Sequence, residues 1–337
     1  MDRIVVASTA GCDTHDTGRR HPEGQARLDA ALRGIQDAAL GDALAVVSPR
    51  PATRDELAHV HDPRYLDALE QFARDGGGQL DPDTVVSEGS FDTARLAVGS
   101  GLVAIDSLRA GDAVAAFVAV RPPGHHAASA VGRGFCLLNS IAVCAATLAA
   151  AGERVLIVDW DVHHGNGTQD IFWDDPRVLY ASTHQWPWYP GTGRASETGG
   201  PRARGLTVNV PLPAGATGDV ALAALDDVVA PAAGGFAPTW VLASAGFDAH
   251  RTDPLAALEW SAGDYALLTR RVAALAPGPG RLVAFLEGGY DLDALSRCVT
   301  ATVRAMAGLA IDAEAPTSGG PGRRDVETIA RGDDVSR

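Results

Sequence analysis

Titratable and metal-binding side chains recur at one kind of position in this 337-residue chain, directly after short apolar runs. Five such segments are 121–126, 159–167, 182–184, 244–250 and 287–290. Short apolar runs bounded by turn residues are typical of buried strands. Because ligands bind beyond the carboxyl ends of the strands in an open α/β sheet, we expect the five segments to meet in one site.

A carboxylate–imidazole pair, Asp161 and His163, stands two residues apart, and Asp248 follows another apolar run. Zinc binds histidine nitrogen and aspartate oxygen, and a catalytic zinc keeps three protein ligands and an open position for water. Either aspartate alone would also suit a helix N-cap after a strand. The histidine favours a metal site, so Asp161, His163 and Asp248 are the predicted ligands.

The adjacent residues His125 and His126 follow a Pro-Pro-Gly turn, whose irregular backbone can aim two neighbouring imidazoles into one cleft. One imidazole can take a proton from a metal-bound water, and one can protonate a leaving amine. Asp159 and Asn166 flank the metal motif and are the candidate partners that would fix the tautomers. The alternative, two purely structural histidines, fits an adjacent pair beside a metal site poorly.

A tyrosine, Tyr290, follows Gly288 and Gly289, which let the backbone approach its neighbours closely. A phenol at this position can donate a hydrogen bond to a developing oxyanion opposite the metal. Tyrosine is also an ordinary packing residue, so the Gly-Gly-Tyr sequence alone does not decide between the two roles.

Elements of alternating type must position these side chains. Apolar runs predict strands at 3–7, 114–120, 154–158, 177–181, 205–210, 239–243 and 281–286. Alanine- and leucine-rich stretches with helical spacing predict helices at 25–40, 92–109, 138–151, 219–230, 261–276 and 293–310. Strands alternating with helices indicate an α/β fold, a mostly parallel central sheet flanked by helices, with the site at the carboxyl ends of the strands.

The chain is expected to form a single catalytic domain over residues 1–311, followed by a polar C-terminal tail, 312–337, with a short helix near 323–331. No element is assigned within 44–90. Hydrophobic residues make up 46% of the chain and charged residues 21%, which is typical of a globular protein with a sizeable core.

Charge and cysteine usage exclude several classes of partner and site. The formal net charge of -14 argues against non-specific binding to nucleic acid or to an anionic membrane. The four cysteines form no CxxC pair, so neither a cysteine-bound zinc nor a disulfide framework is expected. With no signal peptide at the start of this sequence and no apolar run as long as a membrane span, we expect a cytoplasmic protein.

Six long motifs stand out along the chain: RPPGHHA at 121–127, GFCLLN at 134–139, VDWDVHHGNGTQ at 158–169, YPGTG at 189–193, SAGFD at 244–248 and EGGY at 287–290. Together they resemble the motifs of the histone deacetylase family, in particular its class II branch and the bacterial histone deacetylase-like amidohydrolases. The resemblance runs over about residues 12–305. It implies an arginase/deacetylase fold, a zinc-bound water and an acylated amine as substrate.

The resemblance also implies a role for each matching residue. Zinc ligands are Asp161, His163 and Asp248. The general acid/base pair is His125 and His126, and Tyr290 polarises the carbonyl. Asp159 orients His125 and also binds a structural potassium ion, together with Ser182 and the main-chain oxygens of Asp161, His163 and Thr183. A second cation site would use main-chain oxygens near Phe172, Asp175 and Val178.

Asn166 distinguishes the class II pattern, because class I relatives carry aspartate at this place. An amide cannot supply the full negative charge that would raise the pKa of its partner His126. The two histidines should therefore differ in pKa, with His125 the more basic through Asp159.

The substrate tunnel implied by the resemblance is lined by Gly134, Phe135 and Tyr189, with Leu255 at its mouth. Tyr189 stands where relatives often have phenylalanine. Relatives that prefer acetylated polyamines often have an acidic residue in place of Leu255, so an acyl-lysine is favoured here, although Asp81, Asp83 and Glu88 could supply charge at the rim.

Three alternatives remain open: an acetylpolyamine amidohydrolase, a binuclear manganese ureohydrolase and a non-catalytic binding module. The ureohydrolase needs further carboxylates, but Gly165 and His250 stand where a second metal would want aspartate. The binding module would require the loss of a ligand, of the histidine pair or of the tyrosine, and all are present. The sequence does not decide the oligomeric state.

Overall fold

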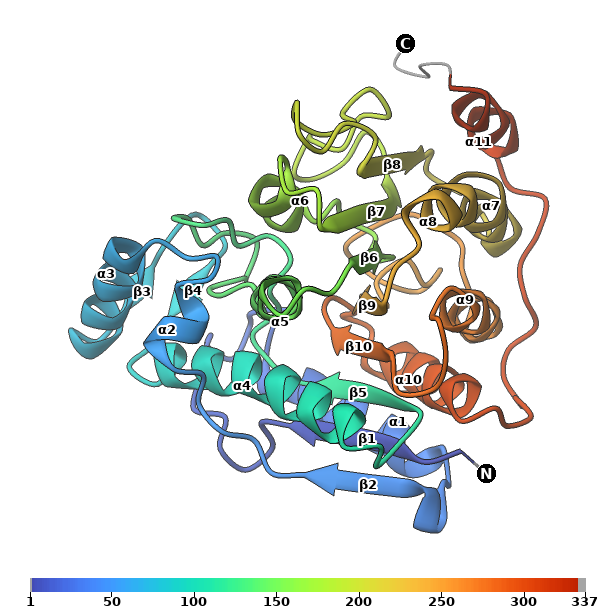
Figure 1. Ribbon diagram of the computed structural model, residues 1–337. Helices are drawn as coiled ribbons and strands as arrows, with labels where there is room; N and C mark the ends of the chain where they lie inside the picture. Colours follow the sequence, from blue (N-terminus) through green and yellow to red (C-terminus); the bar gives the residue numbers. More distant parts are fainter. Residues whose placement is uncertain (1, 333–337) are drawn as a thin grey trace.

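A central sheet of eight strands organises the computed structural model, which describes residues 2–332 (Figure 1). Every strand pairing in this sheet is parallel. From one edge to the other, the strands are β2 (Leu44–Val47), β1 (Ile4–Ser8), β5 (Ala115–Ala119), β10 (Leu282–Leu286), β9 (Trp240–Ala245), β6 (Val155–Asp159), β7 (Val178–Gln185) and β8 (Thr207–Leu212). The predicted α/β fold around a parallel sheet is confirmed.

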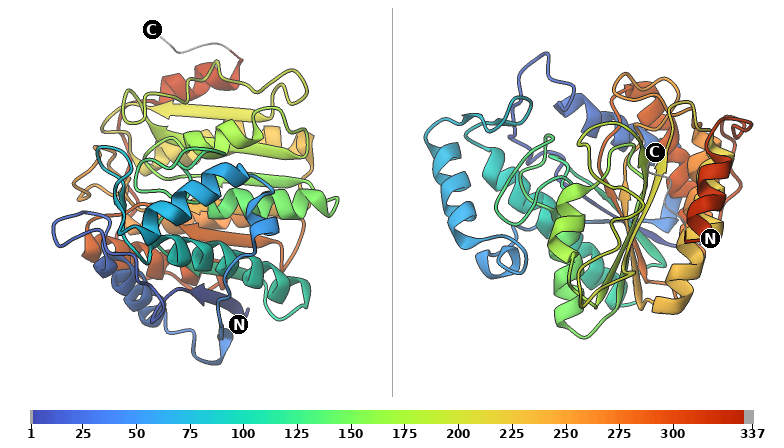
Figure 2. Two further views of the ribbon diagram at one scale, coloured as in Figure 1. Left: turned by 90° about the vertical axis from the view of Figure 1, so that its left-hand side faces the viewer. Right: turned by 90° about the horizontal axis from the view of Figure 1, so that it is seen from above.

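Helices cover both faces of the sheet, as the view from above shows (Figure 2). The sequence of a parallel strand that is buried on both faces is a nearly continuous apolar run, and β5, β6 and β10 have this pattern. Successive side chains point to opposite faces, so Phe117 joins one hydrophobic cluster and Val118 the other. The first cluster includes residues of α1 (Gln25–Asp37), α7 (Gly218–Ala224), α9 (Ala262–Ala274) and α10 (Leu292–Met306). The second includes residues of α3 (Pro63–Arg74), α4 (Ser90–Arg109) and α5 (Ser140–Ala150).

The strand ends converge as the sequence predicts. Asp159, the last residue of β6, pairs in register with Ser182 of β7 on one side and with Ser244 of β9 on the other. The end of β10, Leu286, pairs with Ala245 of β9. The segments that follow these strands therefore leave the sheet at one edge and at nearly one level.

Several elements differ from the sequence prediction. Residues 44–90, to which no element was assigned, contain β2, α2 (Arg54–Leu57), α3 and a small antiparallel hairpin of β3 (Gly78–Gln79) and β4 (Val85–Val86). β2 escapes prediction because it is a short edge strand whose Val46 is 73% exposed. Residues 182–184 were expected after a strand, but they lie inside β7, whose ladder to β8 continues to Gln185.

Two helical regions also differ. The predicted helix at 219–230 is α7 followed by a π-helical turn, Leu225–Val229, and α8 (Ala230–Phe236), because Pro231 begins a new helical segment. The metal motif runs into an unpredicted helix, α6 (Asn166–Phe172).

The C-terminal segment runs along the outside of the molecule and ends in α11 (Arg323–Ala330), near α7 (Figure 1). The main chain of Thr317 donates hydrogen bonds to Asp264, and Gly320 donates one to Thr217. The division at residue 311 stays a prediction. Among residues 2–332, no helix has both the length and the apolar character needed to cross a membrane.

Candidate metal centre and active site

Three predicted ligands meet in one buried cluster. The ligand atoms of Asp161, His163 and Asp248 all lie within 4.8 Å of one another. The Nδ1 atom of His163 is 3.2 Å from Oδ1 of Asp161 and 3.2 Å from Oδ2 of Asp248. The second oxygens of the two carboxylates are held by main-chain donors: Gly288 N–H binds Oδ2 of Asp161 at 2.7 Å, and Val162 N–H binds Oδ1 of Asp248 at 2.9 Å.

The charges in this cluster fit a divalent cation. Burial raises the pKa of Asp248, and the charge of Asp161 raises it further. Burial lowers the pKa of His163, but the hydrogen bonds to the two aspartates outweigh it and raise the pKa to about 10. Two buried carboxylates facing one imidazole are costly without a positive partner, and one nitrogen with two oxygens is a donor set that zinc accepts. The residues present therefore fit the ion that the sequence predicts.

Both histidines of the pair reach the cluster, each with a different partner. Nδ1 of His125 lies 3.1 Å from Oδ2 of Asp159, whereas Nδ1 of His126 lies 2.8 Å from Oδ1 of Asn166. Their ring centroids are 4.0 Å apart, and Nε2 of His125 lies 3.8 Å from Oδ1 of Asp161. The predicted pairing of each histidine with its partner is thus present in the structure.

The two partners separate the pKa values. Burial lowers the pKa of His125, but the charges of Asp161 and Asp159 outweigh it and raise the pKa to about 10. Burial holds the pKa of His126 well below its ordinary value, and the neighbouring His125 and His163 lower it further. The direction of the difference agrees with the expectation from Asn166.

Tyr290 lines the cavity over the metal cluster together with the histidine pair. Its ring contacts Phe135 edge to face, with centroids 5.8 Å apart, and the guanidinium of Arg27 lies 4.8 Å from the ring centroid. Burial raises the pKa of Tyr290 well above its ordinary value, although the charge of Arg27 acts in the other direction. The phenol is therefore a hydrogen-bond donor at neutral pH.

The cavity over the metal cluster has a volume of about 250 Å³. All four predicted tunnel residues line it: Gly134, Phe135, Tyr189 and Leu255. Gly134 has a φ of +56°, and a Cβ there would clash with the ring of His126. Trp188 and Asp83 also line this cavity, and the indole N–H of Trp188 donates to the main-chain oxygen of Leu255 at 3.0 Å.

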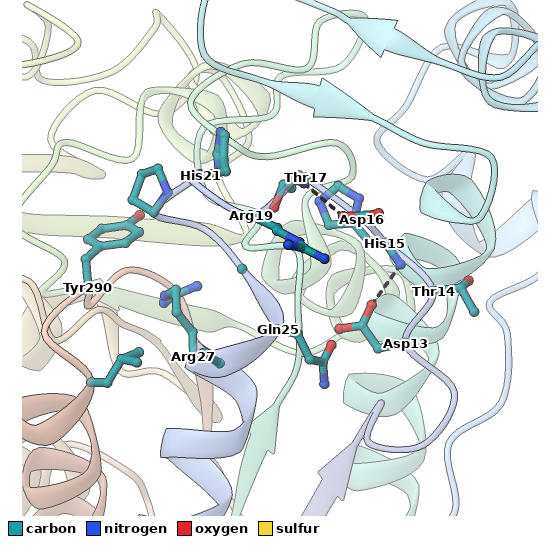
Figure 3. Close-up of a pocket in the computed structure, with 15 residues that line it drawn as sticks. Asp13, Thr14, His15, Asp16, Thr17, Arg19, His21, Gln25, Arg27 and Tyr290 are labelled. Carbon is teal, nitrogen blue, oxygen red and sulfur yellow. Dashed lines mark hydrogen bonds between the residues drawn. The ribbon is translucent and has the colours of Figure 1, made fainter.

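A larger cavity of about 580 Å³ lies beside the first, and Tyr290 lines both. Figure 3 shows Asp13 and His15, on the N-terminal segment that leads into α1, and Arg27, in α1 itself, around this second cavity. The metal cluster does not line it, so its greater size does not make it the candidate active site.

The residues predicted to bind structural cations occupy two places near the ends of β6 and α6. Asp159, at the end of β6, is the cross-strand neighbour of Ser182 within β7, and Tyr180 O–H donates to Asp159 at 3.1 Å. Thr183 follows Ser182 within β7. At the second site, the main-chain oxygen of Phe172 accepts the N–H of Asp175, and that of Asp175 accepts the N–H of Val178. Cation binding at either place stays a prediction.

Sequence reasoning missed several residues that hold the site together. The Glu287 carboxylate accepts N–H groups from Gly124 and His125, at 2.7 and 3.2 Å, and so fixes the turn before the histidine pair. Asp253 accepts the N–H of Tyr290 at 2.7 Å. Glu287 and Asp253 both lie in segments that the sequence marks, but only the folded backbone shows which donors they receive.

A buried ion cluster anchors the N-terminal segment beside the site. Arg121 lies 2.8 Å from Asp13 and 2.8 Å from Glu23, and Arg27 lies 3.2 Å from Glu23. Burial raises the pKa of Glu23, but His15 and the two arginines outweigh it and hold it well below its usual range. Arg27 also donates to the main-chain oxygens of Glu287 and Gly289, so the cluster reaches the loop that carries Tyr290.

Comparison with known proteins gives the family. The model of the histone deacetylase domain matches residues 21–306. A probable deacetylase of Archaeoglobus fulgidus is 39% identical over 305 residues, which are 89% of this chain and 85% of that protein. A histone deacetylase-like amidohydrolase of Pseudomonas aeruginosa is 37% identical over 293 residues, 86% of this chain and 76% of that protein.

A solved structure agrees with the sequence comparisons. The crystal structure of the HDA15 HD domain superposes with a TM-score of 0.88 at 35% identity, covering 98% of this chain and 94% of that one. The chain belongs to the histone deacetylase family. It is accordingly a hydrolase of the deacetylase and amidohydrolase kind, with an acylated substrate. The family is typically metal-dependent, and the group of Asp161, His163 and Asp248 could hold an ion.

Proposed function

We propose that this protein is a zinc-dependent deacetylase that hydrolyses the N-acyl amide of an acetyl-lysine-type substrate. One observation carries the proposal: the buried cluster of Asp161, His163 and Asp248 and the histidine pair lie together at a cavity of about 250 Å³ that Phe135 and Tyr189 line. Such a cavity takes an extended chain and exposes its amide to the metal ligands and the proton-transferring groups at once.

Zinc, when bound by the three ligands, would polarise the amide carbonyl and activate a water molecule. The hydrogen bonds of His126 define its part. Because Nδ1–H of His126 donates to Asn166, Nε2 is left with a free lone pair that can accept the proton of the attacking water. The same Nε2 can then return a proton to the departing amine nitrogen.

His125 has a different role in the proposed reaction. Asp159 accepts its Nδ1–H, and this charged partner favours the protonated ring, so we assign His125 a positive charge beside the reacting atoms. Tyr290, protonated at neutral pH, donates its O–H to the carbonyl oxygen as negative charge develops there.

One metal ion per chain fits the site better than two. A binuclear centre would need a ligand at position 250, but His250 is engaged elsewhere: Nε2 binds Glu314 at 2.9 Å and Nδ1 binds Thr252 at 3.0 Å. At position 165, a Cβ would clash with the carboxylate of Asp159, so glycine is required. Both observations argue against a binuclear manganese ureohydrolase, and the complete set of site residues argues against a non-catalytic binding module.

The walls of the cavity support the proposed substrate class. Leu255 offers no charge at the mouth, so an ammonium group placed beside it would lose water without gaining a partner. The apolar stem of an acyl-lysine has no such cost. An acetylated polyamine is the second candidate, because Asp83 also lines the cavity and the net charge is -14.

Structural potassium is the ion we propose for Asp159 and Ser182, together with the main-chain oxygens of Asp161, His163 and Thr183. A second cation near Phe172, Asp175 and Val178, and a cytoplasmic location, are proposed on the same resemblance. Oligomer formation is compatible with these sites and is not required by them.

Kinetics of the zinc-loaded protein test the proposal. Acetyl-lysine peptides, N-acetylputrescine, N-acetylspermidine and small acetamides are compared by kcat/KM under one condition. We expect the acetyl-lysine peptides to be preferred and a hydroxamate to inhibit. A polyamine preferred by about tenfold, which is 1.4 kcal/mol, would replace the acyl-lysine in the proposal, and hydrolysis of none of these amides would overturn it.

A further inference from the structure

Asp253 collects three main-chain hydrogen bonds from two segments of the active-site edge. Its Oδ2 accepts the N–H of Tyr290 at 2.7 Å and that of Asp291 at 3.3 Å, and its Oδ1 accepts the N–H of Leu255 at 3.0 Å. The side chain is buried, with 7% of its surface exposed. Asp253 belongs neither to the metal cluster nor to the walls of the cavity over it.

Other contacts hold the loop that carries Tyr290 on both sides of the tyrosine. After it, Asp291 caps α10 by accepting the N–H groups of Asp293 and Ala294, and before it the two glycines are bound. Gly288 donates to Asp161 and accepts from Phe247 at 3.0 Å, and the oxygen of Gly289 accepts from Arg27 at 2.7 Å. Gly289 has a φ of +120°, a conformation that ordinary side chains rarely adopt, so glycine is required just before the tyrosine. The bond from Tyr290 N–H to Asp253 fixes the backbone at the tyrosine itself, between Gly289 and the start of α10.

The same carboxylate reaches the mouth of the tunnel. By holding the N–H of Leu255, Asp253 sets the position of a residue that lines the cavity, and the oxygen of Leu255 in turn accepts the indole N–H of Trp188. The Asp253 side chain thus connects Tyr290, the proposed oxyanion donor, with Leu255 at the mouth of the cavity.

We propose that Asp253 is a positioning residue for the reaction: it orients the Tyr290 hydroxyl toward the substrate carbonyl and links that orientation to the position of Leu255 at the mouth of the cavity. This rests on the proposed hydrolysis of an acyl amide. The three N–H donors approach both oxygens of the Asp253 side chain. A carboxylate accepts hydrogen bonds at both positions, whereas a side-chain amide accepts at only one. An asparagine would turn an NH₂ group toward at least one main-chain N–H and release part of the loop.

Misplacing a catalytic group by about 1 Å can cost about 10²-fold in rate. We therefore expect Asp253→Asn to lower kcat by about 10–10²-fold while KM changes less than about threefold and zinc content is unchanged. The decisive readout is the double variant with Tyr290→Phe. If Asp253 acts through the tyrosine, Asp253→Asn should have almost no further effect once the hydroxyl is gone, whereas independent effects would multiply.

Asp264 provides a matched control. It is another buried carboxylate, 2% exposed, that accepts main-chain N–H groups, from Ser261 and Thr317, away from the cavity. Asp264→Asn should lower the stability of the fold and leave kcat within about threefold of wild type, since it removes local hydrogen bonds only. A similar loss of kcat in both variants would mean that Asp253 contributes to stability alone.

Amide hydrogen exchange tests the inference without turnover. Tyr290 lies outside any helix or strand, yet its amide should be protected in the wild-type protein and should exchange at least about tenfold faster in Asp253→Asn. An unprotected Tyr290 amide in the wild type, equal exchange in the two proteins, or multiplicative effects in the double variant would each overturn the role of Asp253. If the wild type hydrolyses no acyl amide, the proposed function fails, and the exchange experiment still decides whether Asp253 holds the loop.

Discussion

The Nδ1 atom of His126 lies 2.8 Å from the amide oxygen of Asn166. This contact fixes the tautomer of His126 without giving it a charged partner, whereas His125 is paired with the carboxylate of Asp159. Two adjacent imidazoles are thereby given opposite tendencies, one to hold a proton and one to release it. Replacing the amide of Asn166 with a carboxylate exchanges one nitrogen atom for oxygen and tests this difference directly.

Asn166→Asp should move the acidic limb of the kcat/KM profile to higher pH. A carboxylate beside His126 favours the protonated ring and raises its pKa, by about 1–3 units for a close opposite charge. Because the free base of His126 is the proposed proton acceptor, a higher pH is then needed to reach it. The measurement is a pH–rate profile of both proteins at equal zinc content, and superimposable acidic limbs would remove His126 from that role.

Asp248→Asn should release the metal while the fold is kept. The amide can still accept the N–H of Val162 through its oxygen, but it no longer carries the charge that binds the ion. Because changes around metal ligands already cost about 10–100-fold in affinity, the loss of a charged ligand should exceed about 10²-fold. Metal analysis should give one zinc per wild-type chain and much less for the variant. Asp293→Asn, at an exposed position in the first turn of α10, serves as the control and should keep the full metal content. Two stoichiometric manganese ions in the wild type would contradict the proposed centre.

Leu255→Glu should shift the preference from acyl-lysine toward acetylated polyamines. A carboxylate at the mouth gives an ammonium group the partner that leucine cannot offer, and a gain of about 1.4 kcal/mol changes the ratio of kcat/KM values tenfold. Leu255→Gln is the matched control, because it has a similar length and no charge. If the glutamate and glutamine variants show the same ratio, charge at residue 255 does not set the specificity.

Acid should destabilise the fold through His61, which is 1% exposed and far from the metal cluster in sequence. Burial lowers the pKa of His61 from 6.5 to about 4, so the unfolded chain binds a proton more readily than the folded one. The contribution of neutral His61 to the free energy of unfolding is therefore fully present above pH 6.5. It is lost as the pH falls toward 4, by up to about 3 kcal/mol.

Chemical denaturation at pH 7 and at pH 4.5 measures this effect. In His61→Gln, which cannot titrate there, the loss of stability between the two pH values should be about 2–3 kcal/mol smaller than in wild type. His59 is exposed two residues earlier, so His59→Gln should keep the wild-type dependence on pH. An unchanged dependence in His61→Gln would show that its ring does not stay neutral in the folded protein.

The sequence predicts the strands and the convergence of their ends because buried parallel strands have an unmistakable apolar pattern. Asp161, His163 and Asp248 can be grouped for the same reason, since each follows such a strand. β2 is not predicted, because a short edge strand lacks the pattern of a buried one. α3 is missed although it carries helix signals: Asp62 is an N-cap, Pro63 follows at the first position, and the buried residues Leu66, Leu69 and Ala73 have helical spacing. The roles of Asp253 and Glu287 cannot be predicted either, because both side chains accept main-chain N–H groups, which carry no sequence signal.

The catalytic assignments themselves stay predictions. The structure brings His125, His126 and Tyr290 to one cavity, and the resemblance to a family supplies their roles.

Glu314 joins the C-terminal segment to the metal loop: its carboxylate binds His250, two residues after Asp248, and also lies 3.3 Å from Arg251 and 3.3 Å from Arg297. Residue 314 lies beyond the part of the chain that the family model matches, which ends at 306. A protein trimmed to that shared boundary would keep every motif residue and still lose the acceptor that holds His250. Residues beyond the matched domain thus act directly on the loop that follows Asp248, so a change at Glu314 could alter the site without touching a motif residue.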